Sequence, residues 1–170
     1  ANDPARGELT ERLAASIYKQ GEQARSAGDN QAAADNFARV AVAAPASAIR
    51  ANAEYDAAAA LIALKDWAGA TRALEDFRRR YPQNPLQPEV TARLALAYSE
   101  QQQWAPAAAQ YERIALAPAT TAEGATRARA AINRSRACRA SSTASAAARA
   151  ACSATRSASP RSAHTVSDCS

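Results

Sequence analysis

The stretch DWAGATRALEDFRRRYP, residues 66–82, recurs along the chain at an interval of 37 residues. A shift of +37 aligns it with QWAPAAAQYERIALAP, and a shift of −37 aligns it with DNQAAADNFARVAVAAP. Three positions hold in all windows, and their spacings of four and three residues are those of a helix with one buried face. They are Ala33, Ala70 and Ala107; Phe37, Leu74 and Tyr111; and Val40, Phe77 and Ile114. A fixed period of this kind indicates stacked helical units.

The three consecutive arginines at 78–80 close this stretch and suggest nucleic-acid binding as one interpretation. Nucleic-acid binding would require basic residues at the matching positions of neighbouring units, so that a basic stripe forms. Those positions hold Ala-Val-Ala at 41–43 and Ala-Leu-Ala at 115–117. Positive charge in the last turn of a helix complements the carbonyl end of the helix dipole. We therefore interpret the arginines as a solvated helix end and predict no nucleic-acid partner.

The composition changes near residue 127. Residues 1–126 carry 13 Lys or Arg and 15 Asp or Glu, a net charge of −2, whereas residues 127–170 carry 8 Arg and one acid, a net charge of +7. The second segment is rich in Ala, Ser and Arg and has few large apolar side chains to offset the entropy lost on ordering. We expect it to be disordered, or loosely helical as far as about Ala151. Its bias also resembles a GC-rich coding sequence read in the wrong frame, so a non-native tail is a second hypothesis.

Each unit is predicted to contain two helices, because a second apolar stripe at helical spacing precedes each repeated stretch. These first helices are expected within residues 9–28, 49–65 and 88–102. Turns of three or four residues join the two helices of a unit and make them antiparallel, and proline-rich linkers separate the units. A single hairpin cannot bury its own apolar face, whereas stacked hairpins share a continuous core. We expect a repeat domain over residues 8–126, with units at about 12–48, 49–85 and 86–122.

The repeated small, aromatic and proline positions resemble the tetratricopeptide repeat over residues of about 8–120. The residues that carry the resemblance are Ala58, Ala95, Tyr98, Ala70, Ala107, Tyr111, Pro45 and Pro82. Three positions depart from the pattern, since Ala24, Leu61 and Leu74 stand where an aromatic residue is usual. The resemblance implies an all-α fold, a right-handed superhelical array of antiparallel helical hairpins.

The unit of 37 residues is longer than the usual tetratricopeptide unit, and one unit ends in the Phe-x-x-x-Tyr-Pro motif of residues 77–82. These two features are similar to the repeats of bacterial envelope proteins, such as the periplasmic Tol-Pal coordinator and the outer-membrane assembly lipoproteins. The resemblance therefore implies a periplasmic protein of envelope assembly or division, and we expect the chain to be a fragment of a longer repeat protein. A fourth unit is expected to begin near residue 124.

The sequence offers little for catalysis. No histidine or cysteine occurs before Cys138, which removes the commonest general base and nucleophile from the repeats. Acid pairs such as Glu75 and Asp76 are adjacent and point away from each other on a helix. The spacing of His164, Asp168 and Cys169 matches no zinc pattern. We predict that the chain is not an enzyme and has no cofactor or metal; catalysis or enzyme regulation by a further domain is left open.

The predicted function is protein–protein interaction, because the first helices of stacked hairpins line a concave groove suited to a peptide or a partner helix. The candidate binding residues on this face are Tyr18, Glu22, Arg25, Asn52, Tyr55, Ile62, Arg93, Leu96 and Glu100. An alternative interpretation is that Tyr18 and Tyr55 cover the contacts between units. Another is a structural role, in which the protein self-associates through an exposed C-terminal end of the repeats. No apolar run of about 18 residues is present, so no membrane span is predicted.

Overall fold

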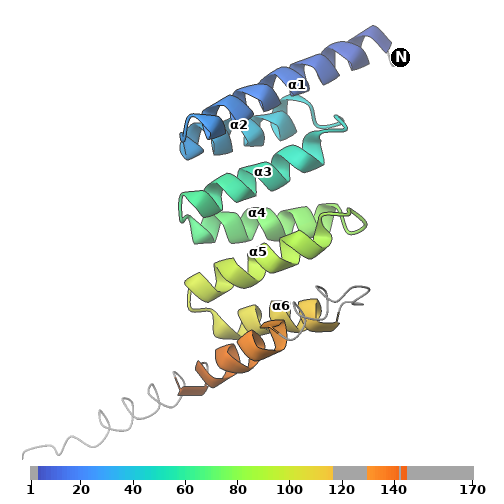
Figure 1. Ribbon diagram of the computed structural model, residues 1–170. Helices are drawn as coiled ribbons and strands as arrows, with labels where there is room; N and C mark the ends of the chain where they lie inside the picture. Colours follow the sequence, from blue (N-terminus) through green and yellow to red (C-terminus); the bar gives the residue numbers. More distant parts are fainter. Residues whose placement is uncertain (1–3, 117–129, 142, 145–170) are drawn as a thin grey trace, which may run out of the picture.

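The computed structural model describes residues 4–116, 130–141, 143 and 144. Within this part of the chain, consecutive helices pack against one another in antiparallel hairpins (Figure 1). Their bounds are α1 Pro4–Ser26, α2 Asn30–Ala43, α3 Arg50–Ala63, α4 Trp67–Arg80, α5 Gln87–Glu100 and α6 Trp104–Leu116. Helices α1, α3 and α5 form one layer of the stack and α2, α4 and α6 the other. The predicted all-α array of helical hairpins is confirmed.

Each hairpin turns at a residue in the left-handed backbone region. These residues are Gly28 (φ 82°), Lys65 (φ 60°) and Gln102 (φ 58°), which are 37 residues apart. In each turn, the amide after the left-handed residue donates to the carbonyl five residues before it, at 2.9–3.0 Å. This hydrogen bond satisfies a carbonyl at the helix end and reverses the chain within three residues. The period seen in the sequence is therefore also a period in backbone conformation.

The residue that completes the turn also starts the next helix. Asp29 accepts a hydrogen bond from the Ala32 amide and Asp66 accepts one from the Gly69 amide, both at 2.9 Å. An Asp side chain at this position satisfies one of the free amides at the start of a helix. In the third unit the same position is Gln103, whose side chain instead donates to Gln101 Oε1 at 3.3 Å.

The linkers between units repeat as well. Ser47 and Asn84, again 37 residues apart, accept hydrogen bonds from the amides of Ile49 and Leu86 at 3.3 and 2.9 Å. These side chains hold the backbone that leads into α3 and α5. Each linker therefore has a set direction, which places the first helix of the next unit against the unit before it.

The core consists mainly of the positions that recur in the sequence. Ala33, Ala70 and Ala107 are completely buried, so the two helices of each unit approach closely at these points. Larger side chains fill the space on either side, one helical turn away. The buried members of these positions are Phe37, Leu74, Tyr111, Val40 and Phe77, and Ile114 is half-buried.

The start of the first helix differs from the sequence expectation. The apolar stripe predicted within residues 9–28 begins with Leu9 and Leu13, but these two side chains are 65% and 48% exposed. The reason is length, since α1 has 23 residues and α2 has 14. The buried stripe of α1 begins at Ala14 and continues with Ile17.

Residues 130–141 form a further helix, which lies against α6 at the end of the stack (Figure 1). Its buried side chains are small, Ala131, Ser135 and Cys138, and they recur at helical spacing. Alanines of α6 face this helix, so the two helices can approach each other closely. This close contact stabilises the packing without the large apolar side chains that we had considered necessary. The helix covers part of the C-terminal end of the third unit, which we had expected to be exposed. The division of the chain into a repeat domain and a separate tail at residues 127–170 stays a prediction. Residues 145–170 lie outside the described part.

Candidate protein-interaction face

The first-helix face is the side of the array formed by α1, α3 and α5, and it carries the nine predicted binding residues. Its first contact between units joins α1 to α3. Tyr18 donates a hydrogen bond to Asp56 Oδ2, and Arg25 pairs with Asp56 Oδ1 at 3.0 Å. The guanidinium of Arg25 also lies 5.3 Å from the centre of the Phe37 ring. One carboxylate of α3 thus binds two of the predicted residues of α1.

The second contact between units joins α3 to α5 in a related way. Tyr55 donates to Glu89 Oε2 at 2.6 Å and accepts from Arg93 Nε at 2.7 Å. The Arg93 guanidinium lies 4.9 Å from the centre of the Tyr55 ring, within the range of a cation–π contact. A tyrosine of one first helix therefore meets a charged residue of the next first helix at both contacts.

Burial and hydrogen bonding stabilise the neutral phenols. Desolvation, followed by the hydrogen bond to Asp56, raises the pKa of Tyr18 to about 12. Desolvation and the hydrogen bond to Glu89 also raise the pKa of Tyr55. Both tyrosines are therefore uncharged hydrogen-bond donors at neutral pH.

The other predicted residues are distributed differently on this face. Asn52, Leu96 and Glu100 are exposed, and Glu22 is half-buried. Ile62 is half-buried and packs against the core cluster around Phe77. The structure thus groups the tyrosine and arginine residues at the contacts between units. It leaves Asn52 on α3 and Leu96 and Glu100 on α5 exposed to solvent.

Two partners in these contacts were not predicted, Asp56 and Glu89. Asp56 follows Tyr18 by 38 residues, and Arg93 follows Tyr55 by the same number. A search for charged residues 38 positions after each tyrosine would have found Asp56 and the pairing of Tyr55 with Arg93. It would not have found Glu89, which follows Tyr55 by 34 residues. The tyrosines bind residues of the neighbouring unit, as the alternative interpretation expects.

The three arginines of α4 have partners within the protein. Arg78 donates to Glu75 at 2.6 Å and to Gln110 Oε1 of α6 at 2.8 Å. The other two also form ion pairs with carboxylates, Arg79 with Asp76 and Arg80 with Glu54 of α3. These pairs offset the positive charge of the helix end. Arg79 and Arg80 are exposed, as expected for a solvated helix end, whereas Arg78 is half-buried and bonds to α6.

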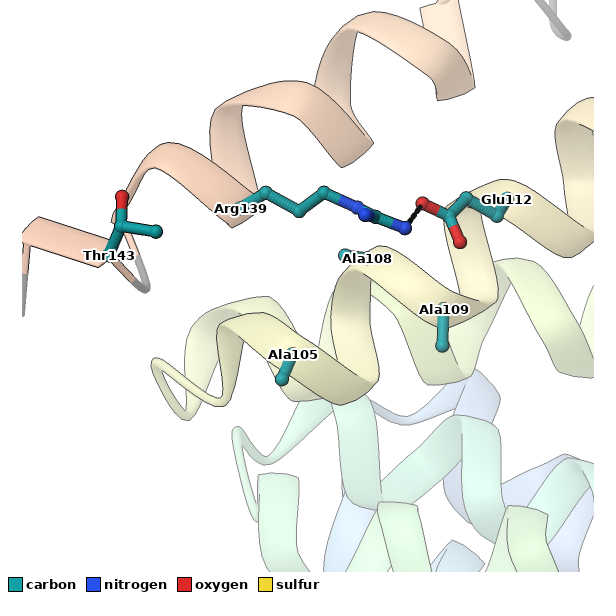
Figure 2. Close-up of a pocket in the computed structure, with 6 residues that line it drawn as sticks. All are labelled: Ala105, Ala108, Ala109, Glu112, Arg139 and Thr143. Atoms are coloured by element: carbon teal, nitrogen blue, oxygen red, sulfur yellow. Dashed lines mark hydrogen bonds and ion pairs between the residues drawn. The ribbon is translucent and has the colours of Figure 1, made fainter. Parts of the chain in front are cut away.

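A cavity of about 450 Å³ lies between α6 and the end of the last described helix (Figure 2). Its α6 wall is built from alanine side chains, and the Arg139 side chain reaches across to Glu112. Hydrogen bonds from Ser135 and then from Arg139 lower the pKa of Glu112. The paired carboxylate is therefore ionised at neutral pH and poorly suited to act as a general acid. The residues that line the cavity are Ala105, Ala108, Ala109, Glu112, Arg139 and Thr143.

Among the described residues, no helix combines the length and the apolar character needed to cross a membrane. The same part of the chain contains no group of three or more His, Cys, Asp or Glu side chains arranged to hold a metal ion. The candidate group of His164, Asp168 and Cys169 lies outside the described residues.

Comparison with known proteins agrees with the repeat architecture. No curated protein matches the sequence. Residues 10–105, which run from α1 into the first turn of α6, match the protein family YfiO, described as outer membrane lipoprotein. This match covers more than half of the chain and confirms the resemblance to outer-membrane lipoproteins with helical repeats. The chain belongs to the YfiO family of outer membrane lipoproteins.

Proposed function

We propose that the chain is a scaffold for protein–protein interaction in assembly of the bacterial envelope, and that it binds a peptide or a helix of a partner on the first-helix face. Membership of the YfiO family supports a place at the outer membrane, and we propose that the repeats face the periplasm. The family is non-enzymatic, so the prediction that the chain is not an enzyme is confirmed.

The observation that carries the proposal is that some residues of the first-helix face form the contacts between units while others stay exposed. The contacts of Tyr18 and Tyr55 connect α1, α3 and α5 in a fixed order. Beside these contacts, Asn52, Leu96 and Glu100 remain exposed on α3 and α5. A surface that is already ordered loses little conformational entropy on binding, which favours affinity.

Site-specific photocrosslinking in cells tests this proposal. A photoreactive residue at position 52 or 96 is expected to crosslink to a partner protein, because both positions are exposed on the first-helix face. The matched control is position 72 on α4, which is also exposed but belongs to the other layer. Equal crosslinking from both layers, or none from positions 52 and 96, would contradict the proposal.

Self-association is the alternative outcome of the same experiment. Leu116 at the end of α6 is 84% exposed, and Leu9 of α1 is 65% exposed, so both ends of the repeats present apolar side chains. Crosslinks from positions 52 and 96 that contain only a second copy of the chain would support the structural role. Sedimentation equilibrium at several concentrations would then show a dimer or a higher assembly.

A further inference from the structure

Tyr18, Tyr55 and Ala92 occupy the same position in α1, α3 and α5, since they are 37 residues apart. In the first two units the tyrosine fills the space between its own hairpin and the next unit. The Tyr18 ring centre lies 5.1 Å from that of Phe37, and the Tyr55 ring centre lies 6.2 Å from that of Phe77. The third unit has only a methyl group at this position.

The helix at 130–141 continues the array in register, so the comparison extends to the third contact between units. Tyr98 of α5 donates to Glu75 of α4 at 2.9 Å, and Ser135 donates to Glu112 of α6 at the same distance. Both residues of the second pair follow those of the first by 37 positions. The helix therefore docks on α6 as α5 docks on α4.

This register shows a second loss of volume at the third contact. Leu94 is completely buried between α4 and α5, and the residue 37 positions later is Ala131. The tyrosine and the leucine of the second contact are thus both replaced by alanine at the third, at Ala92 and Ala131. Removing large side chains from a packed interface leaves a cavity where the surroundings do not close over it.

A cavity of about 240 Å³ is present at this place, and its lining is predominantly apolar. Its walls include Tyr111 and Ile114, which correspond to Leu74 and Phe77 of the preceding unit. Arg134 is exposed, and its guanidinium lies 5.9 Å from the centre of the Tyr111 ring. The residues that line the cavity are Ala92, Tyr111, Ile114, Ala130, Ala131 and Arg134.

We propose that this cavity binds an aromatic side chain, tyrosine or phenylalanine, of a partner protein, which takes the place that the repeat's own tyrosine fills in the first two units. The exposed Arg134 favours an acidic residue next to that side chain in the partner. Leu96, one turn after Ala92 on α5, is 42% exposed and extends the apolar surface beside the cavity. The proposal rests on the proposed function, because it names the anchor with which a partner would bind the first-helix face.

The test uses p-cresol, the side chain of tyrosine as a free molecule, with the full chain. p-Cresol is expected to raise the thermal unfolding midpoint of the wild type in a concentration-dependent way, since a ligand that binds only the folded state stabilises it. Ala92→Tyr should abolish this dependence because its own ring fills the cavity, and Ala131→Leu should weaken it. Ala68→Tyr, at an exposed position of α4, is the matched control and should respond like the wild type. No response of the wild type, or an equal response of Ala92→Tyr, would overturn the proposal.

Photocrosslinking from position 96 separates this proposal from the proposed function. Crosslinks to a partner that disappear in Ala92→Tyr but persist in Ala68→Tyr support an aromatic anchor in the cavity. Crosslinks that are unchanged in Ala92→Tyr overturn the anchor while leaving the interaction face intact. Absence of partner crosslinks in the wild type counts against the proposed function, whatever the response to p-cresol.

Discussion

Gly21 of α1 lies directly against the ring of Phe37 of α2, so that a Cβ atom added at residue 21 would be 2.6 Å from Phe37 Cε1. Phe37 is completely buried and cannot move away without disturbing the core of the first unit. The glycine thus permits the close crossing of α1 and α2.

Gly21→Ala is therefore expected to destabilise the protein by about 1–3 kcal/mol, as overpacking of a well-filled core does. Gly7→Ala is the matched control in the same helix, since a Cβ there would meet nothing within 4 Å. It should stabilise by about 0.5–1 kcal/mol through the higher helix propensity of alanine. Urea unfolding of both variants measures the difference; equal midpoints would contradict the observed crossing.

At the left-handed turn residues, substitution by alanine and substitution by glycine are expected to affect stability differently. Gly28→Ala should cost about 1 kcal/mol, because Gly28 has φ 82° and only backbone strain is added in an open environment. Lys65→Gly, at the equivalent turn, should be neutral or stabilise by up to about 1 kcal/mol, since it relieves strain but loosens the unfolded chain. Thermal unfolding of both variants checks this; a strong loss in Lys65→Gly would show that its side chain stabilises the turn.

Helix α6 lacks the aspartate that begins α2 and α4. Gln103→Asp should supply this acceptor and raise the free energy of unfolding by about 0.5–1 kcal/mol. Asp66→Ala is the converse change and should cost about 0.5–2 kcal/mol, since it removes the hydrogen bond to the Gly69 amide. Chemical denaturation measures the stability of both variants. A lower stability of Gln103→Asp would show that position 103 does not cap α6 as the aspartates cap α2 and α4.

Tyr18 predicts a loss of stability in alkali. Its pKa is raised to about 12 in the folded protein, above the value of about 10 expected in the unfolded chain. The folded state thus favours the neutral phenol, and this contribution is complete below about pH 10 and is lost as the pH rises towards 12.

Tyr18→Phe should accordingly reduce the fall in urea midpoint between neutral pH and about pH 11. It should not abolish the fall, because the pKa values of Tyr55 and Tyr98 are also raised. Spectrophotometric titration of the wild type and the variant measures the phenol directly. A Tyr18 that ionises with an ordinary pKa would refute the half-buried contact with Asp56.

The sequence by itself determined the repeat architecture. Alanine at 33, 70 and 107 and the larger residues one turn later define a helical stripe, which is a local pattern that needs no knowledge of distant contacts. The turns were equally local, since left-handed residues recur every 37 positions and two of the three are followed by a helix-capping aspartate. The resemblance to envelope repeat proteins followed from the unit length of 37 residues and the motif of residues 77–82, and it agrees with membership of the YfiO family.

Only the tertiary structure decided how the first-helix face is arranged. Tyr18 with Asp56 and Tyr55 with Glu89 are pairs from successive units, and their contact depends on the spacing and rotation with which the hairpins stack. Residues 130–141 fall within the fourth unit expected from about residue 124, but their packing against α6 was not predicted, because small side chains stabilise a helix only when an alanine-lined neighbour allows close approach. Periodicity specifies which face of a helix is buried, whereas the stacking of the hairpins specifies which side chains meet across the contact.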